Sequence, residues 1–87
     1  MSETGQGKMT SSEQLRAARA MIGLSQADLA SMTGRTDKTI RRAETDVSLV
    51  AADTVAALRA ALEAAGVVFL SENGNGPGVA LKRKSND

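Results

Sequence analysis

The stretch SQADLASMTGRTDKTIRRAE, residues 25–44, predicts two short helices joined by a tight turn. Ser25 followed three residues later by Asp28 is a capping box, in which each side chain satisfies a free backbone N–H at a helix start. Leu29 falls at an inward position of this first helix. Gly34 suits the left-handed conformation in which helices commonly end, so the first helix is expected to stop there.

The second helix of the pair is expected to begin after Thr36 as its N-cap and to run for about nine residues. Ile40 supplies its buried side, and the small side chain of Ala30 lets the two helices cross closely. Rotating about 100° per residue from Ile40 places Lys38 near 160° and Arg42 near 200°, opposite the core. Two such helices, the second with outward bases, are typical of a helix-turn-helix.

This second helix carries its charge unfavourably. Lys38 lies in the first turn, where exposed N–H groups favour negative charge, and it forms a like-charge pair with Arg42, four residues on. The formal net charge of the chain is only +1, yet Arg35, Lys38, Arg41 and Arg42 fall within eight residues. DNA phosphates and guanine edges would offset these costs on binding. The pattern therefore predicts a DNA-contacting face.

Two further helices are expected around this pair. Ser11, with Gln14 three residues later, predicts a capped helix that ends near Gly23. A fourth helix is expected to start between residues 48 and 53 and to end at Gly66. Its apolar stripe is formed by Val55, Leu58, Leu62 and Ala65. Met21 and Met32 stand at helical spacing and are expected to fill the core.

The chain is too short for two independent cores and divides into four segments. Residues 1–10 are a polar lead that is expected to be disordered, residues 11–66 form the helix-turn-helix domain, and residues 85–87 form a disordered tail. Residues 67–84 read as two strand-like runs around a turn rich in Gly and Asn. The bases of the stretch 81–84 either charge a strand edge or contact phosphate.

A lone two-stranded hairpin is marginal in water, so residues 67–84 should pack on the helices or pair with another copy of the chain. With a single Phe and no Trp or Tyr, the chain has little apolar area per core residue, which makes help from a second copy plausible. The segment is therefore expected to be a dimerisation element. Its apolar residues, which would form the contact, are Val67, Val68, Phe69, Leu70, Val79 and Leu81.

Several classes of function lack the residues they need. The chain has no Cys and no His, which removes thiolate metal sites, the commonest metal ligand and the commonest general base. We expect no enzyme, no cofactor and no metal. Its first residues have no apolar signal core, and no run reaches the roughly 20 apolar residues of a membrane span. A soluble cytoplasmic protein without membrane contact is expected.

From about residue 13 to residue 66, the chain resembles the Cro and phage-repressor (XRE-like) family of helix-turn-helix transcriptional regulators. The resemblance rests on SQADLA, the glycine that follows, and TIRRAE. It implies an all-α, lambda-repressor-like bundle of four to five helices, to which the short C-terminal β extension is added. The sequence departs from the family pattern at Ala43, where a larger aliphatic residue is common, and in the loop after Glu44, which lacks the usual Gly and Pro.

The resemblance also implies roles for individual residues. Gln26 would brace a phosphate and pack toward the second helix of the pair, Arg41 would touch the DNA backbone, and Arg19 would form a structural salt bridge with Glu44. Asp37 reads either as a helix-stabilising anion or as an acceptor from cytosine N4. The full set of expected DNA-contacting residues is Gln26, Arg35, Thr36, Asp37, Lys38, Arg41, Arg42 and Thr45.

The function expected from these residues is sequence-specific DNA binding by a homodimer that regulates transcription. Simple occupation of a promoter would make it a repressor. Two copies would read a pseudo-palindromic operator whose half-sites lie about 34 Å apart on one face of double-stranded DNA. The alternative is a protein-binding module of the same fold, such as an antitoxin or anti-activator, for which DNA binding is secondary and a protein partner comes first.

Overall fold

The computed structural model describes residues 10–71 and 74–82, which are mostly helical with one small antiparallel sheet. The predicted disordered lead, except Thr10, lies outside these residues, as do the tail and Arg83 and Lys84. In chain order the elements are α1 (Ser12–Met21), α2 (Gln26–Thr33), α3 (Asp37–Thr45), the short 3-10 helix η2 (Val47–Leu49), α4 (Ala52–Ala64), β1 (Val67–Leu70) and β2 (Gly78–Leu81).

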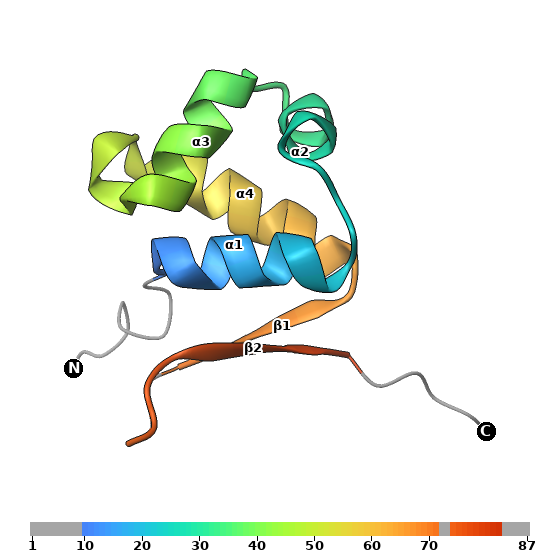
Figure 1. The fold of residues 1–87 in the computed structure, drawn as a ribbon, viewed down its shortest axis with the longest axis vertical. Coiled ribbons are helices and arrows are strands. Elements are labelled where there is room, and N and C mark those ends of the chain that lie inside the picture. The colour runs from blue at the N-terminus through green and yellow to red at the C-terminus, as the bar shows by residue number, and fades with distance from the viewer. Residues whose placement is uncertain (1–9, 72–73, 83–87) are drawn as a thin grey trace.

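The elements are arranged in layers (Figure 1). Helix α1 crosses the middle of the molecule, with α3 on one side of it and the hairpin β1–β2 on the other. The side chains of Leu15, Leu29, Ile40, Leu58 and Leu62 fill the space between the four α-helices and have no exposed surface. None of the helices in the described part of the chain is both long and apolar enough to span a membrane.

The predicted helix starts and stops are confirmed. Ser11 and Gln14 form the capping box of α1, and Ser25 and Asp28 form that of α2. The hydrogen bond from the Ser25 backbone N–H holds the pKa of the Asp28 carboxyl below its usual value. The ionised carboxylate therefore stabilises α2 at a pH above the usual pKa of aspartate, and this stabilisation is lost as the pH falls through the lowered pKa. Gly34 ends α2 in the left-handed conformation, with φ of 67°.

The two strands of the hairpin pair with each other within the chain. Val67 lies opposite Leu81 and Leu70 opposite Gly78 in an antiparallel register. Because side chains alternate along a strand, Val67 and Phe69 face the helices. The guanidinium of Arg59 on α4 lies over the Phe69 ring, 4.8 Å from its centre. The strands therefore complete the core.

This arrangement corrects part of the predicted dimerisation element. Val67 and Phe69 are buried in their own chain, and Val79 is half-buried against the same core, so these three cannot form the centre of a contact with another molecule. The strand period of two separates them from the exposed side chains of Val68 and Leu70. Leu81, opposite Val67 at the open end of the hairpin, is also exposed.

The prediction that Met21 and Met32 fill the core is wrong, because their side chains are 41% and 51% exposed. Both lie in the last turn of a short helix. Ile22, the residue after the end of α1, packs against the core in place of its neighbour Met21. Ala65, predicted to extend the stripe of α4, is exposed because α4 ends at Ala64.

Gln14 connects α1 to both strands. Its Oε1 accepts the Ser11 N–H at 3.0 Å, and its Nε2 donates to the carbonyls of Leu70 at 3.1 Å and Gly78 at 2.9 Å. The side chain is almost completely buried, so these hydrogen bonds are shielded from water. One amide therefore caps a helix and also holds the two strands together where they approach their turn.

We expect Gln14→Glu to lower the free energy of unfolding by roughly 2–4 kcal/mol at neutral pH, because a buried carboxylate would face two carbonyl oxygens. The loss should shrink as the pH falls, since a protonated carboxyl group can again donate. Urea unfolding of both proteins measures it. The matched control is Glu13→Gln, which makes the reverse exchange at the exposed neighbouring position. An equal loss in the free energy of unfolding in both variants would contradict the role given to Gln14.

Candidate nucleic-acid interface

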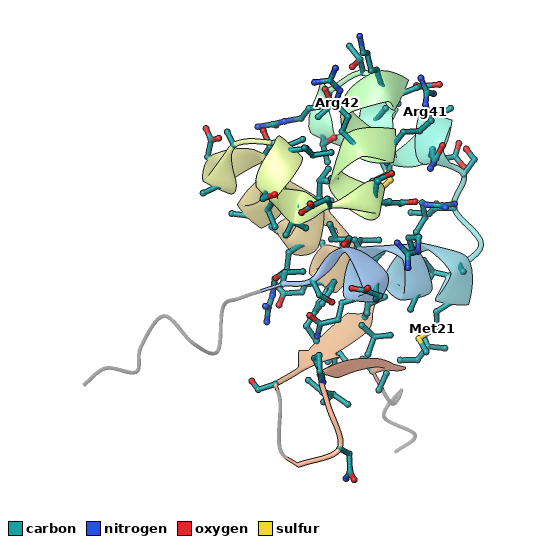
Figure 2. The ribbon with its side chains drawn as sticks, turned by 60° about the vertical axis from the view of Figure 1, so that its left-hand side comes forward. Met21, Arg41 and Arg42 are labelled. Atoms are coloured by element: carbon teal, nitrogen blue, oxygen red, sulfur yellow. The ribbon has the colours of Figure 1, made fainter. Side chains whose placement is uncertain are left out.

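The exposed side of α3 carries Lys38, Arg41 and Arg42, whereas Ile40 and Ala43 on its inner side are completely buried. Figure 2 shows Arg41 and Arg42 directed away from the body of the protein, at the end opposite the hairpin. Thr36 caps the helix, its hydroxyl accepting the Thr39 N–H at 3.2 Å. The predicted helix, with Thr36 before its first residue and nine residues in length, is confirmed.

No hydrogen bond or ion pair joins the side chains of Lys38, Arg41 and Arg42 to any residue within 10–71 and 74–82. Other arginines of the same protein are engaged: Arg59 pairs with Glu63 at 3.0 Å, and Arg35 donates to the Thr33 carbonyl at 2.8 Å. The positive charges of α3 are thus exposed and uncompensated locally. Such charges can meet the phosphates of a nucleic acid without first breaking a contact.

The hydroxyls of the predicted contact residues are already engaged. The Thr36 and Thr39 oxygens lie 3.1 Å apart and share a hydrogen bond. Thr45 donates its hydroxyl hydrogen to the Arg41 carbonyl at 2.9 Å. These threonines lie on the same helix as the free cations, but each hydroxyl has a partner within the chain. Asp37, at the start of the helix, is exposed.

Glu44 fixes α3 against the rest of the domain. Its carboxylate is buried and accepts from Arg19 Nε at 2.6 Å and Nη2 at 3.0 Å, so the predicted Arg19–Glu44 salt bridge is confirmed. Arg19 also donates to the Leu24 carbonyl at 2.8 Å. The hydrogen bond with Glu44 raises the pKa of the Arg19 guanidinium above its usual value. This planar, two-bond pair sets the angle of α3 relative to α1.

Two more side chains converge on Glu44. Gln26 Nε2 donates to Glu44 Oε1 at 3.1 Å, which confirms that Gln26 packs toward this helix and joins the start of α2 to the end of α3. Arg16 donates to the Glu44 backbone carbonyl. This role of Arg16 was not predicted, although its spacing of three from Arg19 places both side chains on one face of α1.

Asp46, in the loop after α3, is the N-cap of η2. Asp46 Oδ1 accepts the Ser48 N–H at 2.9 Å and the Ser48 hydroxyl at 2.8 Å, which caps η2. The backbone hydrogen bond keeps the pKa of Asp46 below its usual value, so the group is an anion at neutral pH.

An open groove beside this loop, between η2 and α4, is lined mostly by apolar side chains, among them Val47, Val50 and Val55. The polar residues at its edge include Arg59 and Glu63, which are paired with each other. No cluster of three or more His, Cys, Asp or Glu side chains suited to a metal ion occurs in the described part of the chain. The exposed cations Lys38, Arg41 and Arg42 do not line this groove.

A scan of protein-family models and a search of curated proteins each found no match to this chain.

We expect Glu44→Gln to destabilise the protein by roughly 1–3 kcal/mol, because the half-buried Arg19 guanidinium would lose the carboxylate charge that pairs with it. The control is Glu63→Gln, which removes an exposed carboxylate from the Arg59 pair and should cost only about 0.3–0.5 kcal/mol. Thermal or urea unfolding measures both. Similar losses in the two variants would show that Glu44 does not hold the helices together.

Proposed function

We propose that this protein binds double-stranded DNA sequence-specifically, with α3 in the major groove, and regulates transcription by occupying its site. The observation that carries the proposal is the outer side of α3, where Lys38, Arg41 and Arg42 are exposed and have no partner among the described residues. An α-helix fits the major groove, and lysine and arginine are the side chains that recognise guanine and phosphate there.

The support from the back of the helix strengthens this proposal. Base recognition requires side chains held at a defined angle to the groove, and the contacts of Glu44 with Arg19 and Gln26 fix α3 through its buried side. The outer side remains free for a ligand. A mere solvated helix face does not require such a buried polar anchor.

The identification as a lambda-repressor-like, XRE-like regulator is part of the proposal. It is supported by the resemblance of residues 13–66 and by the α2–α3 pair, in which Gly34 makes the turn and Ala30 is buried at the crossing. Within this proposal Gln26 and Arg35 lie at the margin of the DNA contact. Both already make one hydrogen bond inside the domain, so we assign them phosphate contacts in addition to a structural role.

A homodimer on one operator is part of the proposal, and we place its contact beside α3 rather than on the outer face of the hairpin. The hairpin and α3 lie at opposite ends of the molecule in both views (Figures 1 and 2). A twofold axis through the hairpin would turn the two α3 helices to opposite sides of the dimer. Two copies that read one side of a duplex must therefore meet along a flank beside α3.

We expect Arg42→Ala to weaken binding to a selected operator by roughly 1–3 kcal/mol and to relax specificity at one base pair, because a bidentate contact to guanine is lost. Fluorescence anisotropy with operators selected from random DNA measures the change. Lys82→Ala, which removes an exposed cation at the hairpin end, is the control and should leave cognate affinity almost unchanged. Equal binding by the Arg42 variant would remove this residue from the recognition set.

A protein-binding module is the second candidate, and the outer hairpin face is the observation in its favour. Val68 and Leu70 are 39% and 45% exposed on the side of β1 that faces away from the helices, which gives this face of the hairpin an apolar surface. Exposed apolar patches mark contact sites for other proteins when they are contiguous. This surface lies far enough from α3 that the two activities can be separated by substitution.

We expect the double variant Val68→Lys and Leu70→Lys to keep its fold and its DNA affinity within about twofold, because both side chains point away from the core. Any association through the hairpin, with a partner or a second copy, should be lost. Sedimentation and anisotropy on the same samples measure both properties. Ser71→Lys, which adds one positive charge beside the patch, is the control. Loss of DNA binding by the folded double variant would contradict the separation of the two surfaces.

A further inference from the structure

The free polar groups on the outer side of α3 form a restricted set. Lys38, Arg41 and Arg42 offer N–H donors, and Asp37 offers a carboxylate; all four are exposed and without a hydrogen-bond partner within the described residues. The hydroxyls of Thr36, Thr39 and Thr45 are engaged with each other or with the backbone. The helix therefore presents strong donors and one acceptor, all of them ionised.

Groups that recognise an A·T pair are missing from the same surface. The sequence of α3 contains no Asn and no Gln, the side chains that pair with both N6 and N7 of adenine. The amide of Gln26, the nearest such group in the chain, donates to Glu44. The apolar side chains of α3, Ile40 and Ala43, are buried. The methyl groups of Thr36 and Thr45, at the two ends of the helix, and of the half-buried Thr39 remain for thymine.

What is present matches a G·C pair on both edges. Guanine shows two acceptors, O6 and N7, in the major groove, and lysine and arginine donate to them. Cytosine shows the N4 donor, which aspartate accepts. Phosphates repel a nearby carboxylate unless the carboxylate accepts a hydrogen bond from such a donor. Asp37 therefore favours sites that place a cytosine beside it.

The spacing of the cations sets the spacing of the bases. Lys38 and Arg42 are four residues apart on one face, a rise of about 6 Å along the helix. Base pairs stack about 3.4 Å apart, so the two side chains reach positions one to two steps apart. Arg41 lies to the flank of this line, beside the DNA backbone.

We infer that the centre of each half-site consists of G·C pairs. Lys38 and Arg42 contact two guanines that are adjacent or separated by one base pair, and Asp37 contacts a cytosine. This inference rests on the proposed function and specifies its ligand. Positions that contain A·T pairs are confined to the margins of the half-site, beside the threonine methyl groups.

The test uses the full chain and sites selected from random duplex DNA. We expect selection to enrich two G·C pairs within a three-base-pair window. Replacing either guanine by 7-deazaguanine, which lacks the N7 acceptor, should weaken binding about 5- to 150-fold. In Lys38→Ala, the replacement should weaken binding little further at the guanine that Lys38 contacts, and the same holds for Arg42→Ala at the other guanine. This comparison assigns each side chain to its base. Asp37→Asn should relax or shift the preference at the cytosine, and Lys82→Ala serves as the control.

Three outcomes would overturn the inference. Selected sites with A·T pairs at their centre would do so, as would full binding to 7-deazaguanine duplexes; in both cases salt-dependent DNA binding would persist and the proposed function would stand. Absence of salt-dependent binding to any duplex by the folded protein would overturn the inference and the proposed function together. Circular dichroism confirms that each variant is folded before it is scored.

Discussion

The buried carboxylate of Glu44 is the constraint on which the arrangement of the helices depends. It stands at the end of α3, receives two hydrogen bonds from Arg19 of α1 and one from Gln26 of α2, and is almost completely shielded from water. A buried charge is costly unless it is fully paired, so only one relative placement of these helices satisfies it. The outer side of α3 can therefore carry mutually repelling cations without shifting its position.

Local features of the fold were predictable from the sequence because they depend on residues a few positions apart. The capping residues Ser11 and Ser25, the left-handed Gly34 and the buried Ile40 all follow from short-range rules of helix geometry. The free cations Lys38 and Arg42 were predictable for the same reason. A helix of known phase determines which side chains point outward.

Features that depend on distant parts of the chain were not predictable in this way. Gln14 contacts carbonyls 56 and 64 positions further on, and nothing near it in the sequence indicates that role. The division of the hairpin into buried Phe69 and exposed Leu70 required knowing which side of the strands meets the helices. The methionines illustrate the converse: helical spacing alone suggested burial, but Met21 and Met32 lie where no neighbouring element covers them.

The position of the hairpin beneath the helices also affects the order of folding. Val67 and Phe69 close the underside of the helical core, yet they leave the ribosome after all four α-helices have been made. A nascent chain that has emerged only as far as Gly66 exposes the apolar surface that these two residues later cover. The domain thus completes its core only after the hairpin has been made, and until then the apolar underside of the helices is open to chaperones and proteases.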